Sequence, residues 1–205
     1  MVSSWLRHGH PRSPRRLSSD ITLQLAAGAD TTATVIKTTT LFIATKPRVL
    51  GKLRAEISTA ERDGRISSPV ITNRESLALP YVQAVVKEGL RIFNPVPGLL
   101  TKLVPEGGDT IAGVWVPGGT RVSSSLWSQQ RDGVYGEDGD RFWPERWIEA
   151  DKERRVAMER QLDCSFGVGR WAYLGKPVAW MELNKVFVEV SANPSLLRWS
   201  AGMRC

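Results

Sequence analysis

Residues 166–177 read Phe-Gly-Val-Gly-Arg-Trp-Ala-Tyr-Leu-Gly-Lys-Pro, a glycine-rich stretch that runs directly into a segment of helical pattern. Glycines allow a backbone to approach another group closely. The free N–H groups at the start of the following helix favour an anionic partner. A phosphate-binding loop is one interpretation. It is poorly supported, because Gly167 and Gly169 lack the third glycine of a dinucleotide loop and Gly175-Lys176 is followed by proline.

Helical patterns flank this stretch and recur along the chain. Pro47, Pro80 and Pro177 each stand where a helix can begin, and Asp20 is a candidate N-cap. The expected helices cover residues 20–44, 47–62, 80–92, 151–160 and 177–190.

A short β element is expected between the third and fourth of these helices. Residues 110–116 and 120–124 flank Pro117-Gly118-Gly119, which predicts a hairpin with its turn at the glycines. Residues 64–79 and 128–150 are expected to be loops, and long loops in a compact protein are usually functional. The predicted fold class is therefore α+β, mainly helical.

The composition sets limits on these interpretations. The 205 residues are 41% hydrophobic and 24% charged, which excludes a disordered chain, a collagen and a coiled coil. The two cysteines, Cys164 and Cys205, exclude a disulfide-dense scaffold. No uncharged apolar run is long enough to span a bilayer, so no transmembrane anchor is expected.

The net charge of +7 is unevenly distributed. Residues 1–19 contain four arginines and no acidic residue, and we expect a disordered basic tail there, with a transit peptide as the alternative. A nucleic-acid-binding protein is a weak alternative, because most of the excess charge belongs to this tail. Residues 192–205 carry no pattern and are expected to form a second tail.

Two polar groups of residues stand out from the helical patterns. Glu88 and Arg91 are three residues apart and share a helix face. Arg146 lies in Phe142-Trp143-Pro144-Glu145-Arg146-Trp147, where a partly buried guanidinium would need several acceptors. We expect a Glu88–Arg91–Arg146 triad that attaches the long loop to the helix.

The first helix contains Ala27-Gly28-Ala29-Asp30-Thr31-Thr32, an unusual sequence for a helix interior. It indicates either a functional segment or a helix that is interrupted there. Together with Lys87-Glu88-Gly89-Leu90-Arg91, the Pro-Glu-Arg element and the glycine-rich loop, it occurs in the order and spacing of one family. Over about residues 20–191, the chain resembles the C-terminal, haem-side part of the cytochrome P-450 monooxygenases, most closely the pisatin-demethylase-like members of filamentous fungi.

The resemblance implies a role for each motif. Asp30 and Thr31 would deliver protons during oxygen activation at a haem, and Glu88, Arg91 and Arg146 would form the structural triad. Arg170 and Lys102 would neutralise haem propionates, although exposed surface charge explains them equally well. The positions implied to bind the cofactor are Phe166, Gly167, Gly169, Arg170, Tyr173, Gly175 and Lys102.

The sequence departs from the family at Tyr173, which stands where the family has the cysteine that ligates the iron. Thiolate donation favours O–O cleavage, whereas tyrosine ligates iron in catalases. A free tyrosine has a pKa of about 10, and its ring is bulky for a tight loop. We therefore expect Tyr173 to abolish normal haem-thiolate chemistry. Cys164 precedes the loop and is expected to be a small buried residue.

The resemblance also implies partners and a location. Family members oxidise small organic substrates with electrons from a reductase, usually at the endoplasmic-reticulum membrane. The family fold is considerably larger than 205 residues, so we expect an incomplete fold that is inactive as it stands. The alternative is a non-catalytic remnant or interaction fragment. The identity of the substrate does not follow from this part of the sequence.

Overall fold

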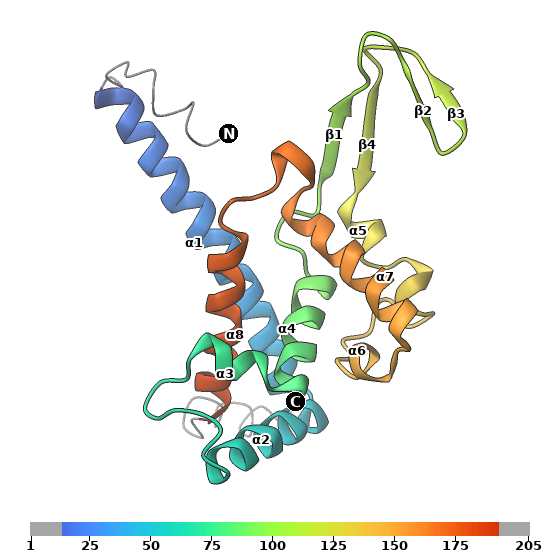
Figure 1. Cartoon of the computed structure of the whole chain (residues 1–205). Coiled ribbons are helices and arrows are strands. Elements are labelled where there is room, and N and C mark those ends of the chain that lie inside the picture. Colours follow the sequence, from blue (N-terminus) through green and yellow to red (C-terminus); the bar gives the residue numbers. More distant parts are fainter. Residues whose placement is uncertain (1–13, 193–205) are drawn as a thin grey trace.

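The structure is a computed structural model of the chain, and it describes residues 14–192 (Figure 1). Three helices from distant parts of the sequence pack together at its centre: α1 (Pro14–Thr45), α4 (Pro80–Ile92) and α8 (Lys176–Ala192). Helix α2 (Pro47–Arg62) and the short α3 (Asn73–Leu77) pack against one end of this group. Their buried faces form one apolar core, which includes Val35, Leu53, Val82, Val85, Val86, Leu183 and Phe187.

The helix starts follow local chemistry. Pro47 and Pro80 occupy first-turn positions in α2 and α4, where the missing N–H costs nothing. Thr72 caps α3 and exchanges hydrogen bonds with Glu75 in a capping box. The predicted ranges 47–62 and 80–92 are confirmed.

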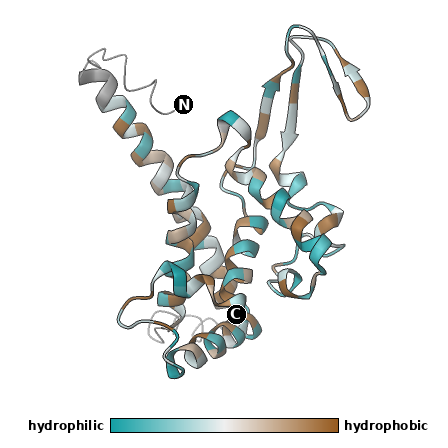
Figure 2. Ribbon diagram, in the orientation of Figure 1, coloured by the Kyte–Doolittle hydropathy of each residue, from teal (hydrophilic) through white to brown (hydrophobic). Residues whose placement is uncertain are grey.

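Helix α1 begins at Pro14, six residues before the predicted N-cap Asp20. Residues 14–19 of the expected tail therefore belong to this helix, while residues 1–13 and 193–205 lie outside the described part of the chain. Residues 21–25 of α1 include apolar side chains (Figure 2) that are exposed, of which Leu23 is 69% and Leu25 is 68% exposed.

The predicted hairpin around Pro117-Gly118-Gly119 is wrong. Strand β2 (Asp109–Ile111) pairs with β3 (Val114–Val116), and the turn between them is Ala112-Gly113, with φ values of 51° and 82°. Positive φ at both central residues suits the right-handed twist of a two-residue hairpin. Strand β4 (Arg121–Ser125) instead pairs antiparallel with β1 (Leu99–Leu103), which the sequence reasoning missed. Both hairpins extend away from the central helices (Figure 1).

The expected loop at 128–150 contains short pieces of helix. These are α5 (Leu126–Gln129), the 3-10 turn Gly133–Tyr135 and α6 (Arg146–Glu149). Helix α7 (Lys152–Asp163) covers the predicted surface helix and continues into two 3-10 turns, Cys164–Phe166 and Gly169–Trp171, that lead to α8. Within residues 14–192, none of the helices combines the length and apolar character needed to cross a membrane.

Candidate functional site

A cavity of about 340 Å³ lies where α1, α8 and the glycine-rich loop meet. Most of its lining is apolar, and hydroxyl groups come from Thr31, Thr32, Ser165 and Tyr173. Apolar walls with a few polar groups are typical of a site for a small organic molecule or cofactor. The remaining lining residues are Ala27, Val35, Leu90, Pro95, Val96, Leu100, Phe166, Gly167, Ala179 and Leu183.

One wall of the cavity is a face of α1. Ala27, Thr31 and Val35 recur every four residues, so they share that face. The hydroxyl of Thr31 donates a hydrogen bond to the carbonyl oxygen of Ala27 at 2.8 Å. Asp30 is exposed and does not line the cavity. Of the two residues expected to handle protons, the structure thus places only Thr31 at the cavity.

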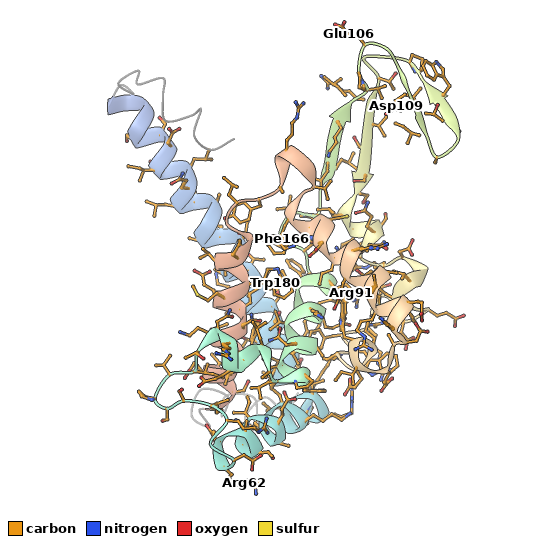
Figure 3. The ribbon with its side chains drawn as sticks, in the orientation of Figure 1. Arg62, Arg91, Glu106, Asp109, Phe166 and Trp180 are labelled. Carbon is orange, nitrogen blue, oxygen red and sulfur yellow. The ribbon has the colours of Figure 1, made fainter. Side chains whose placement is uncertain are left out.

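Another wall of the cavity is the glycine-rich loop. Gly167 has a φ of 70°, and the N–H of Tyr173 donates to the carbonyl oxygen of Phe166 at 2.8 Å, which closes the loop. The rings of Phe166 and Trp180 lie side by side, with centroids 6.2 Å apart (Figure 3). A Cβ added to Gly175 would lie 2.5 Å from the ring of Tyr173, so this glycine makes room for the tyrosine.

Several predicted site residues lie away from the cavity. Gly169 and Arg170 are exposed in a turn outside its lining. Lys102 lines a second hollow of about 330 Å³ beside the two hairpins. Glu106 and Asp109 lie in the part of this hairpin region that is farthest from the central helices (Figure 3). The structure therefore brings neither basic residue to the cavity, and their expected role in neutralising propionates has no geometric support.

Of the two cysteines, the structure describes Cys164. Cys164 is partly exposed and does not line the cavity, and its Sγ lies 3.5 Å from the carbonyl oxygen of Arg160. The expectation that Cys164 is buried is therefore wrong. Cys205 lies outside the described residues. Among the described cavity-lining residues, the phenol of Tyr173 is the polar group at the expected ligand position.

Glu88, Arg91 and Arg146 meet beside α4 in a buried ionic cluster, with side chains 0%, 0% and 3% exposed. Arg91 contacts both carboxylate oxygens of Glu88, at 2.9 Å from Nε and 2.8 Å from Nη2. Arg146 Nε donates to Oε1 at 3.1 Å. The backbone N–H of Trp143 and the indole N–H of Trp147 add bonds of 2.8 and 2.9 Å. Glu88 therefore has five donors, which compensates for its loss of water.

The two arginines also bind the loop that contains α5 and α6. Arg91 reaches three carbonyl oxygens at 2.6–3.0 Å, and Arg146 Nη2 reaches two at 2.9 and 3.0 Å. Burial lowers the pKa of the Arg146 guanidinium, and the charge of Glu88 opposes that shift. The carbonyl oxygens contacted by this pair belong to Gln130, Tyr135, Asp138, Gly139 and Arg141.

A second ionic cluster, centred on Glu145, was not anticipated. Its Oε1 accepts hydrogen bonds from Lys52 at 2.8 Å, from the hydroxyl of Tyr81 at 3.0 Å and from Arg48. Burial by itself raises the pKa of Glu145, but the bonds from Arg48 and Lys52 outweigh it and lower the pKa to about 2. Arg48 and Lys52 are four residues apart on α2 and therefore share a helix face. This spacing in the sequence could have indicated that they share an acidic partner.

Comparisons with known proteins place this geometry in context. The sequence model described as Cytochrome P-450 matches residues 10–191. The cytochrome P-450 monooxygenase ABA1 of Pyricularia oryzae is 45% identical over 191 residues, which cover 93% of this chain and 37% of that protein. Its namesake in Botryotinia fuckeliana is 38% identical with the same coverage. The pisatin demethylase of Fusarium vanettenii is 34% identical over 88% of this chain and 34% of its own length.

Proposed function

Because the chain belongs to the cytochrome P-450 family, we propose that its cavity is a haem pocket of a monooxygenase fold in which Tyr173 prevents thiolate-type oxygen chemistry. The observation that carries this proposal is that Tyr173 and Thr31 line the same cavity. The chain spans about a third of the length of the curated relatives that it matches. The activity of the whole protein, its substrates and its reductase are therefore part of the proposal.

The walls of the cavity suit an apolar group. Thr31, Val35, Phe166 and Gly167 are among the residues that would hold it. When a haem is bound, its iron supplies the oxidising chemistry that the family performs. The residues present fit the apolar part of such a group but not a thiolate-ligated iron, because no cysteine among the described residues lines the cavity.

The chemistry of a phenol explains the expected loss of activity. A phenol oxygen lacks the strong electron donation of a thiolate sulfur. A thiolate ligand is what favours O–O cleavage in this family. Tyr173 would therefore act as an oxygen ligand without thiolate character or as a wall of the pocket.

The arrangement of Thr31 and Asp30 is also unsuited to the delivery of protons to a molecule in the cavity. Thr31 faces the cavity, but its hydroxyl proton is engaged with the carbonyl oxygen of Ala27. Asp30 is exposed on another face of α1. We propose that Thr31 shapes the pocket and would have to rotate its hydroxyl before it could donate a proton to a bound molecule.

A small organic substrate and a reductase are the partners that fit this proposal, and nucleic acid is not among them. The basic residue Lys176 beside the loop is engaged by Asp163 at 2.8 Å, which reduces its availability to an acidic reductase. A non-catalytic interaction role is the second candidate function. The exposed apolar residues favour it, since Leu174 is 96% and Leu23 is 69% exposed.

Absorption spectra of the full chain test the proposal. The purified protein is mixed with ferric haem, reduced with dithionite and exposed to carbon monoxide. We expect haem binding without the red-shifted Soret band of a thiolate-ligated iron. The Tyr173→Cys variant should gain that band, whereas the control variant Cys164→Ser should match the unmodified chain. A thiolate-type band from the unmodified chain would refute the proposal.

A further inference from the structure

Gln130, the residue that follows α5, is a fully buried amide with a partner on each polar atom. Its Nε2 donates to the hydroxyl oxygen of Ser165 at 2.9 Å, and the carbonyl oxygen of Gln161 lies 3.5 Å from the same nitrogen. Its Oε1 lies 3.2 Å from the hydroxyl of Tyr135, which also lies 3.0 Å from the carbonyl oxygen of Met158. A buried amide with both ends satisfied is held in one orientation.

The backbone of Gln130 belongs to the ionic cluster described above. Its carbonyl oxygen accepts a hydrogen bond of 2.7 Å from Nη1 of Arg91. Arg91 is itself fixed by two bonds to Glu88. The main chain of Gln130 is therefore attached to α4, while its side chain reaches the 3-10 turn Cys164–Phe166.

That turn contributes Ser165 and Phe166 to the cavity wall. A second amide joins the same regions, since Gln161 Nε2 donates to the carbonyl oxygen of Gln129 at 2.6 Å. The bond from Gln130 differs from it, because Gln130 contacts a residue that lines the cavity. A path of hydrogen bonds thus runs from Glu88 through the side chains of Arg91 and Gln130 to Ser165 at the cavity wall.

We infer that Gln130 is a positioning residue, which holds Ser165 and Phe166 at the cavity wall in a fixed relation to the Glu88–Arg91–Arg146 cluster. Loss of its side-chain bonds should allow the 3-10 turn to open more often, and the shape of the cavity should change with it. The inference rests on the proposed function only in treating the cavity as a haem pocket. The movement of the turn can be measured without haem.

The thiol of Cys164 is a natural probe, because it is partly exposed at the start of the same turn. The experiment uses full-length chain with Cys205→Ser, so that one thiol remains, and measures the rate of alkylation by iodoacetamide. Gln130→Leu and Ser165→Ala should each accelerate alkylation about fivefold, the scale of one lost buried hydrogen bond. The double variant should be no faster than Gln130→Leu, because that change already removes the bond to Ser165.

Gln83→Leu is the matched control. The amide of Gln83 donates to the carbonyl oxygen of Ser76 at 3.1 Å and to Oδ1 of Asn184 at 3.2 Å, and none of these three residues lines the cavity. This variant should lower the midpoint of urea unfolding without changing the alkylation rate of Cys164. Equal alkylation rates in the unmodified chain, Gln130→Leu and Ser165→Ala would overturn the inference. Ser165→Ala keeps it testable if Gln130→Leu does not fold.

Titration with ferric haem, followed by absorbance, separates the two proposals. Gln130→Leu and Ser165→Ala should weaken haem binding by the same factor of about five, and Gln83→Leu should not. If the unmodified chain binds no haem, the proposed function fails while the alkylation rates still decide the role of Gln130. If haem binds the unmodified chain and Gln130→Leu equally well, the positioning role fails and the proposed function stands.

Discussion

The phenol ring of Tyr173 stacks on the ring of Phe166, with centroids 6.5 Å apart and planes inclined by 14°. Both rings line the cavity, and Tyr173 remains 43% exposed. Stacked aromatic pairs contribute about 0.5–1.5 kcal/mol beyond the area that they bury. Tyr173 is therefore a packed part of the loop, and its replacement has both a structural and a chemical effect.

Tyr173→Cys should give a thiolate-type spectrum with bound haem but no measurable oxidation of organic substrates. The single change supplies the ligand, yet it leaves Asp30 exposed and the hydroxyl of Thr31 bonded within its helix. Turnover is measured by product formation from a panel of small organic molecules with a reductase and NADPH. Tyr173→Phe serves as the control for the loss of the hydroxyl alone, and it should show neither the band nor turnover. Substrate oxidation by Tyr173→Cys would contradict the prediction.

Glu88→Gln should lower the free energy of unfolding by about 3–5 kcal/mol, because it leaves two buried guanidinium groups without their carboxylate. Urea unfolding followed by tryptophan fluorescence measures the change. Glu159→Gln is the matched control, since Glu159 pairs with Lys87 at a surface site and is 44% exposed. That variant should change the free energy of unfolding by less than about 1 kcal/mol. Similar losses for both variants would show that the cluster does not stabilise the fold.

Local sequence chemistry predicted those parts of the fold that depend on neighbouring residues. The starts of α2 and α4 followed from Pro47 and Pro80, whose fixed φ suits the first helical turn. Asp20 did not mark the start of α1, which begins at Pro14. A residue that often caps helices can also lie inside a longer helix, so its presence alone does not locate the first turn. The hairpins were misjudged because strand pairing depends on contacts between residues far apart, as between Leu99 and Ser125.

In the candidate site, too, features that depend on neighbouring residues could be predicted, whereas features that depend on residues far apart in the sequence could not. The spacing of Glu88 and Arg91 indicated a shared face, and the aromatic surroundings of Arg146 indicated burial, so this cluster could be anticipated. Gln130 could not, since one glutamine in a polar segment carries no periodic signal. Its role depends on Ser165, which lies 35 residues away along the chain. Lys102 was expected at the cavity, but the actual strand pairing carries it to the other hollow.

Acid should destabilise the protein over a range of pH that depends in part on the pKa of Glu145. Its pKa is lowered from 4.5 to about 2, so its contribution is complete above pH 4.5 and is lost as the pH falls toward 2. The free energy of unfolding of Glu145→Gln should therefore change less between about pH 5 and pH 3 than that of the unmodified chain. Urea unfolding at several pH values measures this dependence, and parallel curves for the two proteins would contradict the prediction.

Glu75 provides an independent comparison in the same pH range. Hydrogen bonds from Ser67 and Thr72 lower the pKa of this partly exposed carboxylate to about 2. Glu75→Gln should also flatten the pH dependence of unfolding. The Glu75→Gln/Glu145→Gln double variant should be flatter than either single variant, because the two groups share no partner and their effects add.

Gly89→Ala should destabilise the crossing of α1 and α4, although alanine is the better helix former by about 1 kcal/mol. An added Cβ would lie 2.1 Å from Oγ1 of Thr39, which is fully buried, so the helices would have to separate. Overpacking of this kind costs about 1–3 kcal/mol.

The side chain of Thr39 determines whether Gly89→Ala lowers or raises the stability of the fold. Its Oγ1 has no hydrogen-bond partner, so Thr39→Val, which replaces the hydroxyl by a methyl group, should stabilise the fold by about 1 kcal/mol. Thr39→Ala removes the two atoms nearest to the added Cβ, at 2.1 and 2.9 Å, and should make Gly89→Ala neutral or favourable. Thermal unfolding of the four combinations of Thr39→Ala and Gly89→Ala measures the coupling. Additive effects would mean that the contact between Thr39 and Gly89 does not limit how closely α1 and α4 approach.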